Sequence, residues 1–174
     1  LTPGDNRVSL LRGGQTCSNG KVLAAGPDGL TLFDIDTPTK TVARYRLDVP
    51  GRRLEPLGTA LDLRAEPGFP DGMVDAGDGT AVVAFYNPGS VAFGRAVRYD
   101  LRTGEPLEEW RTPGSPRVTC PCLVPRADGV KLVLTTATEG MPAAQRTLCQ
   151  DAGSLFVAGT RLGAAPPAPV VVLS

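Results

Sequence analysis

An Asp-Gly turn followed by an apolar strand pattern returns at a fixed interval along this chain. The sequence reads PDGLTLF at 27–33, GDGTAVV at 77–83 and ADGVKLV at 127–133, so the Asp-Gly pairs begin at 28, 78 and 128. Asp-Gly suits the positive φ angles of tight β-hairpin turns. A turn and a strand repeated at this interval indicate a repeat architecture, and Asp28, Asp78 and Asp128 are therefore predicted to be turn residues.

Each repeat contains several short strand patterns in the same order. They lie at Leu30–Ile35, Thr41–Asp48 and Arg52–Leu57, then at Thr80–Tyr86, Arg95–Leu101 and Gly104–Trp110, and finally at Val130–Thr136 and Gly153–Gly159. Helical periodicity is confined to the region of Met141–Gln150. Four short antiparallel strands per unit of about 40–50 residues are typical of a β-propeller blade. A β-sandwich is the alternative, but it does not require one element order at a constant period.

We therefore predict an all-β fold made of three four-stranded antiparallel blades, which is half of a six-bladed propeller. The expected blades cover residues 19–57, 71–110 and 118–160, with a tail at 161–174. An open arc of three blades leaves the apolar faces of its end blades uncovered. We expect a missing N-terminal half, a separate partner chain or self-association to cover them. The first residue is Leu rather than Met, which is consistent with a trimmed start or with a piece of a longer chain.

Composition excludes several classes of function. Lys and Arg total 18, Asp and Glu also total 18, and aromatic residues make up 5%, so nucleic acid is not an expected partner. No apolar run approaches the roughly 20 residues that span a bilayer, so no membrane partner is expected. We predict a cytoplasmic protein. Histidine is absent, which excludes Ser-His-Asp and Cys-His catalysis and favours an oxygen-ligated cation such as Ca²⁺.

The four cysteines are predicted to be buried core residues. They are Cys17, Cys120, Cys122 and Cys149, and they form no C-x-x-C pair. Without histidine this spacing does not indicate a zinc site, and free Cys behaves as a small hydrophobic residue. A single long-range disulfide that involves Cys149 is left open.

Two carboxylates, Asp34 and Asp36, flank Ile35 and share one side of a strand. They could serve acid–base chemistry or a second cation. A solvated blade edge beside Lys40 and Arg44 is the interpretation we favour.

Five short motifs occur in a characteristic order. They are CSNG at 17–20, DTPTKTVARYRLD at 36–48, FPDGMVD at 69–75, VTCPCL at 118–123 and TTATEGM at 135–141. The first and third stand just before strands that we expect to open a blade. In this order the motifs resemble those of the SMP-30/gluconolactonase/LRE-like (regucalcin-like) family. The resemblance runs from Gln15 to Phe156 and corresponds to the C-terminal half of the family's domain.

The resemblance implies a six-bladed propeller with one divalent cation near its axis, acting as a metal-dependent hydrolase of sugar lactones or related esters. Asn19 matches the amide ligand of the metal, and Asp71 matches the aspartate that both ligates the metal and acts as general base. Ca²⁺ is the expected cation, with Zn²⁺, Mn²⁺ or Mg²⁺ as the others to consider. The cation would polarise the lactone carbonyl, and the carboxylate would take the proton from the attacking water.

The chain also departs from the family pattern. The family's glutamate ligand lies in the N-terminal half, and its F-G-G segment is LVPR at Leu123–Arg126 here. The predicted hydrolase would therefore be competent only with the other half of the propeller. A non-catalytic propeller module that binds a small molecule or a protein is the alternative, in which Asn19 and Asp71 are plain turn residues. Organophosphate hydrolysis and strictosidine-synthase-type chemistry are further alternatives.

Overall fold

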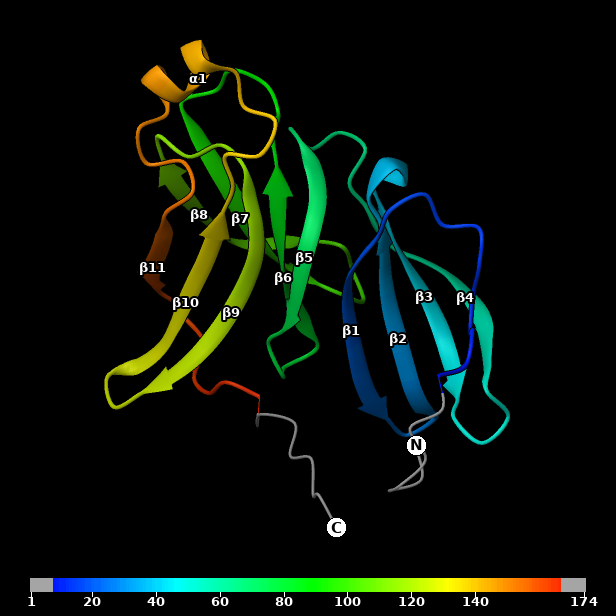
Figure 1. The fold of residues 1–174 in the computed structure, drawn as a ribbon. Helices are drawn as coiled ribbons and strands as arrows, with labels where there is room; N and C mark the ends of the chain where they lie inside the picture. The colour runs from blue at the N-terminus through cyan, green and yellow to red at the C-terminus, as the bar shows by residue number, and fades with distance from the viewer. Residues whose placement is uncertain (1–7, 167–174) are drawn as a thin grey trace.

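The computed structural model describes residues 8–166, and almost all of its regular structure is β-strand (Figure 1). The strands are β1 (Ser18–Gly26), β2 (Gly29–Asp36), β3 (Thr41–Asp48), β4 (Arg53–Asp62), β5 (Phe69–Asp75), β6 (Thr80–Tyr86), β7 (Phe93–Asp100), β8 (Pro106–Pro113), β9 (Val118–Arg126), β10 (Gly129–Thr136) and β11 (Leu155–Gly159). A 3₁₀ turn, η1 (Thr37–Thr39), follows β2, and a short helix, α1 (Ala143–Leu148), lies in the predicted helical region.

The strands form three separate antiparallel meanders in chain order. Their spatial orders are β1-β2-β3-β4, β5-β6-β7-β8 and β11-β10-β9. The Asp-Gly pairs lie at the β1–β2, β5–β6 and β9–β10 hairpins, and their glycines have φ angles of 101°, 82° and 114°. The all-β fold with repeated antiparallel sheets is confirmed. The alternative of a two-sheet sandwich is excluded, because the strands divide into three sheets.

Two details of the sequence interpretation were wrong. The third sheet has three strands rather than four within residues 8–166. The two short motifs that carry Asn19 and Asp71 do not stand just before the strands that open the sheets, because they lie inside β1 and β5, which are themselves the first strands. The Asp-Gly turns follow these strands, so each sheet begins one strand earlier than the repeat alone indicates.

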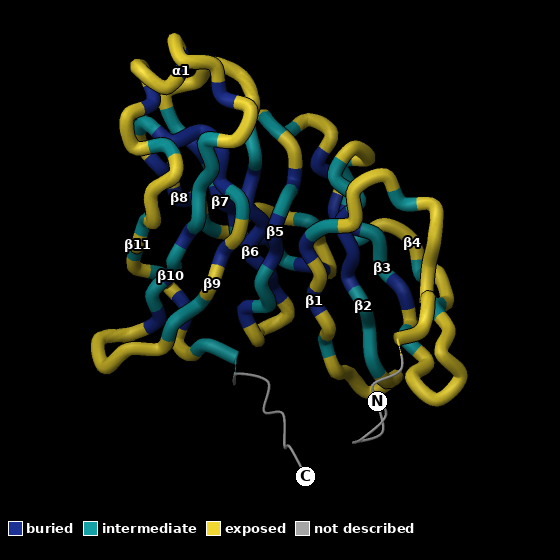
Figure 2. Tube along the Cα trace, in the orientation of Figure 1, coloured by how far each residue is buried: buried dark blue, intermediate teal, exposed yellow. Residues whose placement is uncertain are grey.

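Hydrophobic side chains join the successive sheets face to face. Figure 2 shows where buried residues lie along the strands of these sheets. Ile35 of the first sheet packs in one cluster with Val83 and Phe85 of the second. A second cluster joins Ala96 of the second sheet to Leu132 of the third. The second sheet is therefore covered on both faces, which explains why β6 is buried from Thr80 to Phe85.

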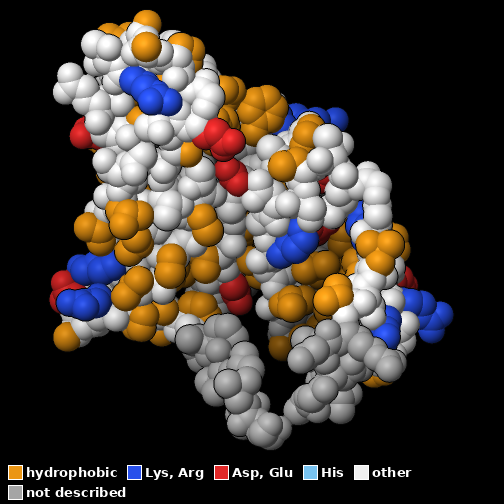
Figure 3. Space-filling view, in the orientation of Figure 1, with side chains coloured by type: hydrophobic (Ala, Val, Ile, Leu, Met, Phe, Trp, Pro, Cys, Tyr) orange, Lys and Arg blue, Asp and Glu red, His pale blue; other side chains and the backbone are white. Residues whose placement is uncertain are grey.

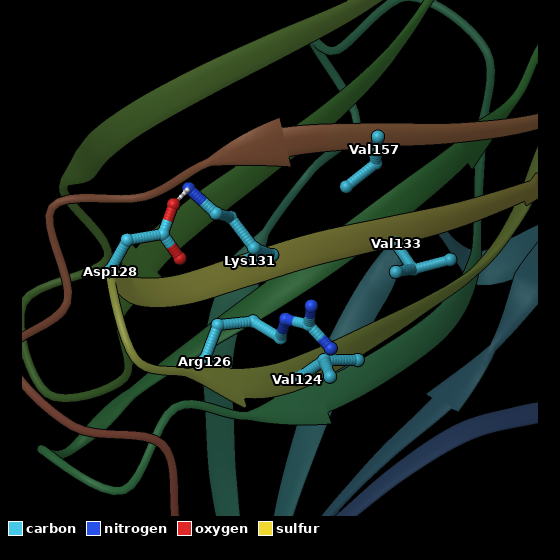
Figure 4. Close-up of a pocket in the computed structure, with 6 residues that line it drawn as sticks. All are labelled: Val124, Arg126, Asp128, Lys131, Val133 and Val157. Atoms are coloured by element: carbon cyan, nitrogen blue, oxygen red, sulfur yellow. Dashed lines mark ion pairs between the residues drawn. The ribbon is translucent and has the colours of Figure 1, made fainter.

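The third sheet has one face that no other sheet covers. Val157 and Leu155 of β11 are each 71% exposed there. In Figure 3, hydrophobic side chains gather over β9, β10 and β11 in the lower left of the view. A depression of about 400 Å³ opens on this face, and Figure 4 shows Val133, Val157 and the Asp128–Lys131 ion pair lining it.

The outward face of the first sheet is partly covered by the chain itself. Leu23 on this face is 53% exposed, whereas Tyr45 is only 5% exposed. Arg12, from the segment that precedes β1, hydrogen-bonds the Tyr45 hydroxyl and lies 4.9 Å from its ring centroid. No helix among residues 8–166 is long and apolar enough to cross a membrane.

Candidate functional site

The first strands of the three sheets lie against one another through two glycines. A Cβ atom on Gly20 of β1 would come within 2.5 Å of the Met73 backbone nitrogen and 2.7 Å of the Asp71 carbonyl oxygen. A Cβ atom on Gly72 of β5 would come within 2.6 Å of the Thr119 carbonyl oxygen on β9. The glycine after Asn19 and the glycine after Asp71 therefore allow β1, β5 and β9 to touch. This contact brings together the two residues that the sequence predicts as metal ligands.

The Asn19 carboxamide is held by a hydrogen-bonded bridge between the first two sheets. Its Nδ2 donates to the Thr37 hydroxyl at 3.2 Å, and that hydroxyl donates to the Pro70 carbonyl oxygen at 2.9 Å. Pro70 is buried and directly precedes Asp71. The bridge therefore connects Asn19 to the backbone that carries Asp71.

Asp71 is a half-buried carboxylate in an unusual electrostatic position. Burial raises its pKa above the ordinary value of 3.8, and a hydrogen bond from the Asn19 amide lowers it in part. No Lys or Arg within residues 8–166 forms an ion pair with it. A carboxylate that is desolvated without a basic partner is a candidate functional group.

Cys120 of β9 lies near Asp71 and is the contribution of the third sheet to this site. Its Sγ would lie 3.1 Å from a Cβ atom on Gly72, the residue after Asp71. Burial, the charge of Asp71 and then Cys122 raise the pKa of the Cys120 thiol. Thr135 fixes this part of β9, because its hydroxyl accepts a hydrogen bond from the Cys120 backbone nitrogen at 3.0 Å.

Asn19 and Asp71 fit a hard divalent cation as part of its coordination shell. Amide and carboxylate oxygens are the donors that Ca²⁺ prefers. Within residues 8–166 no hydrogen-bond donor reaches Asn19 Oδ1, so this oxygen is free to coordinate. Ca²⁺ takes 6–8 ligands, however, and the described part of the chain has no group of three His, Cys, Asp or Glu that could hold a metal. These two residues can supply only a portion of the shell.

The sequence predicted Asn19 and Asp71 but missed Thr37 and Cys120. Both missed residues fall inside the motifs at 36–48 and 118–123. Thr37 and Cys120 therefore belong to the family pattern. The order of the motifs along the chain, however, does not indicate that β1, η1, β5 and β9 lie close together.

The carboxylates of Asp34 and Asp36 do not form the solvated blade edge beside Lys40 and Arg44 that the sequence favours. Asp34 is only 3% exposed, and it forms an ion pair with Lys21 at 2.6 Å rather than with Lys40 or Arg44. Asp36 accepts hydrogen bonds from the Cys17 backbone nitrogen at 2.8 Å and from that of the preceding residue at 3.2 Å. These carboxylates therefore fix the chain that enters β1.

The cysteine prediction was wrong for three of the four residues. Cys149 is buried, but Cys17, Cys120 and Cys122 are exposed, and all four are free thiols. Cys122 pairs with Val133 on the face of the third sheet that no other sheet covers. Its side chain is exposed because its apolar neighbours have no opposing sheet.

These exposures predict two classes of thiol in the native chain. We expect Ellman's reagent to modify Cys17, Cys120 and Cys122 in the folded protein as the rapid phase, with Cys120 the slowest of the three because its pKa is raised, and Cys149 only on unfolding, because Cys149 is 5% exposed. A Cys149→Ser variant should keep the full rapid phase. Four equally fast thiols, or fewer than three, would contradict the described packing.

The raised pKa of Asp71 predicts a stability effect in the cation-free protein. Between the ordinary value of 3.8 and the raised value, the folded state binds more protons than the unfolded state. Stability therefore falls as pH rises through this window and stays lower above it. We expect Asp71→Asn to melt at a higher temperature than wild type at neutral pH, with the difference closing below the ordinary pKa.

The matched control is Asp28→Asn, which changes the same residue type in the first hairpin turn. Thermal melts in the presence of a chelator, at neutral and acidic pH, would measure both variants. A lower melting temperature for Asp71→Asn at neutral pH would show that the carboxylate stabilises the fold and is not a desolvated functional group.

The depression on the third sheet is separate from these residues. It is lined by Val124, Arg126, Asp128 and their neighbours near the β9–β10 turn, whereas Cys120 lies near the start of β9. It is therefore a feature of the uncovered face and not of the candidate cation site.

Known proteins resemble this chain in sequence. A putative sugar lactone lactonase, YvrE, of Bacillus subtilis is 31% identical over 138 residues, which cover 79% of this chain and 45% of YvrE. An uncharacterized protein of Sulfolobus acidocaldarius is 34% identical over 104 residues, which cover 60% of this chain and 35% of that protein. The chain thus spans less than half the length of these relatives.

Solved structures show the same fold. The calcium-binding protein regucalcin from Agrobacterium tumefaciens superposes with a TM-score of 0.65 and 24% identity, over 84% of this chain and 47% of that one. Luciferin-regenerating enzyme superposes with a TM-score of 0.71 and 20% identity, over 92% of this chain and 51% of that one. The three sheets therefore have the fold of regucalcin-type propellers.

The family model described as the SMP-30/gluconolactonase/LRE-like region matches residues 1–138. This match includes both first strands, β1 and β5, that carry the candidate ligands. The chain belongs to the SMP-30/gluconolactonase/LRE-like family.

Proposed function

We propose that this chain supplies part of the active site of a metal-dependent hydrolase that opens sugar lactones or related esters. The observation that supports the proposal most is the placement of Asn19 beside Asp71 on touching first strands, with no basic residue among residues 8–166 paired to the carboxylate. Family membership and the putative lactonase among the relatives are consistent with this substrate class.

In the proposed reaction, Asp71 acts as general base. Its carboxylate accepts a proton from the water that attacks the lactone carbonyl, and the ring C–O bond then breaks. Asp71 returns the proton to the ring oxygen, so the product is a hydroxy acid. A bound divalent cation supplies Lewis acidity toward the carbonyl. Asn19 and Asp71 would hold this cation, with Ca²⁺ as the proposed ion.

We also propose that the site becomes complete only with a second half-propeller. The chain covers 47–51% of the two structures, and its third sheet keeps an apolar face uncovered. Such a face is unfavourable in a repeat array without a cap. An additional N-terminal half or a second copy of the chain would cover both end sheets. In either closed ring, Cys122 would lose its reactivity toward thiol reagents.

One observation favours the alternative of a non-catalytic binding module. The described residues contain no group of three His, Cys, Asp or Glu that could hold a metal. If no second half brings further ligands, the chain would use its propeller scaffold for binding alone. The cytoplasmic location and the absence of a nucleic-acid partner remain predictions.

The test is hydrolysis of a sugar lactone by the native assembly. A pH indicator would monitor the acid that the reaction releases. We expect turnover that a chelator abolishes and Ca²⁺ restores. Native mass measured in parallel distinguishes the 18.1 kDa chain alone from larger assemblies. A closed ring that turns over no lactone or ester at any divalent cation would support the binding module instead.

A further inference from the structure

The Thr37 hydroxyl lies at a junction that the proposed mechanism does not use. Thr37 begins η1, the turn after β2, and its side chain reaches across to the second sheet. It contacts Asn19 on one side and the backbone before Asp71 on the other, at 3.2 Å and 2.9 Å. No other hydroxyl within the described residues hydrogen-bonds the Asn19 side chain.

The hydrogen bonds of the Thr37 hydroxyl determine which end of the Asn19 carboxamide faces it. A threonine hydroxyl has one proton to donate and lone pairs to accept with. Thr37 gives its proton to the Pro70 carbonyl oxygen, which can only accept. Toward Asn19 it can therefore only accept, so Asn19 must turn its NH₂ group to Thr37. The carboxamide oxygen then points away from Thr37 and stays without a donor among residues 8–166.

We propose that Thr37 is a positioning residue that helps to select the carboxamide orientation of Asn19, so that Nδ2 is turned to Thr37 and Asp71 and Oδ1 is left without a donor and open to a cation. In its consequence for cation binding, this inference rests on the proposed function. A flipped amide would aim NH₂ at the cation, which repels it, so the orientation decides whether Asn19 can be a ligand at all. The orientation itself is a property of the cation-free protein.

The turn does not depend on this hydroxyl for its backbone. The Thr37 backbone nitrogen donates to the Cys17 carbonyl oxygen at 3.1 Å, and that of Lys40 donates to the Thr37 carbonyl oxygen at 3.2 Å. A Thr37→Val variant keeps these bonds and the side-chain shape, and it loses only the hydroxyl. Thr37→Ser restores the hydroxyl.

Thr39→Val is the matched control from the same turn. The Thr39 hydroxyl donates to the Asp36 carbonyl oxygen at 2.7 Å, and its other hydrogen bonds are with Thr41 rather than with Asn19 or Asp71. All three variants would be compared with wild type in two measurements on the native protein. One is the side-chain NH₂ signal of Asn19 by NMR without cation, and the other is Ca²⁺ affinity by calorimetry.

We expect Thr37→Val to shift the Asn19 NH₂ signal and to speed its solvent exchange about fivefold, because one positioning hydrogen bond is worth about 1 kcal/mol. Ca²⁺ affinity should fall about fivefold in Thr37→Val. Thr37→Ser and Thr39→Val should stay near wild type in both measurements. Rescue by serine separates the hydroxyl from a general loss of packing.

An unchanged Asn19 signal in Thr37→Val would overturn the inference. So would a signal that shifts equally in Thr39→Val. If wild type binds neither Ca²⁺ nor another divalent ion, the proposed function fails, while a shift confined to Thr37→Val would still support the orienting role.

Discussion

Gly20→Ala and Gly72→Ala are expected to be severely destabilising. An added Cβ atom would lie 2.5 Å from the Met73 backbone nitrogen in the first variant and 2.6 Å from the Thr119 carbonyl oxygen in the second. These obstacles are backbone atoms, so the strands themselves must separate. Overpacking of this kind costs about 3 kcal/mol or more. For a chain of this size we expect a fall in melting temperature of about 6–12 °C.

The control is Gly26→Ala at the other end of β1. Its added Cβ atom would have a nearest neighbour at 3.9 Å, and its φ is not positive. Urea unfolding and thermal melting of the three variants would measure the difference. Equal stability of Gly20→Ala and Gly26→Ala would contradict the close contact between β1 and β5, and with it the placement of Asn19 beside Asp71.

Asp71→Asn is expected to remove hydrolysis by the assembled protein. The variant keeps the shape and hydrogen-bonding capacity of the side chain but can no longer accept a proton or bind a cation with charge. Loss of a general base lowers the rate by about 10²–10⁴-fold. Because the neutral side chain suits its partly buried position, the rate should fall without any loss of stability.

Initial rates of lactone hydrolysis across substrate concentrations would separate the effects on kcat and on KM. Asp28→Asn serves again as the control, since Asp28 is a hairpin-turn residue and should retain full activity. A rate within a few-fold of wild type in Asp71→Asn would exclude Asp71 as the base, whatever the assembly state of the chain.

The repeated Asp-Gly turns predicted the fold class because hairpin chemistry is local. Positive φ at Gly29, Gly79 and Gly129 is a property of the turn itself, and it fixes where two strands of each sheet meet. The sequence could not show that SNG at 18–20 and PDG at 70–72 lie inside strands. Their glycines are required by contacts with neighbouring strands, and such contacts depend on the assembled sheets.

The exposure of Cys120 and Cys122 illustrates the same limit. Alternation along β9 predicts that both thiols share a face, and β9 does place them there. Whether another sheet covers that face is a question of assembly, and residue type alone cannot answer it. Asp34 is the opposite case, because its burial depends on Lys21 and on the chain before β1.

A Ca²⁺ titration followed by thermal melting tests whether Asn19 and Asp71 hold a cation, with wild type and Asp71→Asn measured side by side in the native assembly. We expect a melting temperature that rises with Ca²⁺ concentration in wild type, as for any ligand that binds the folded state, and no rise in Asp71→Asn. Identical curves for the two proteins, with or without a rise, would contradict a cation site built on Asn19 and Asp71.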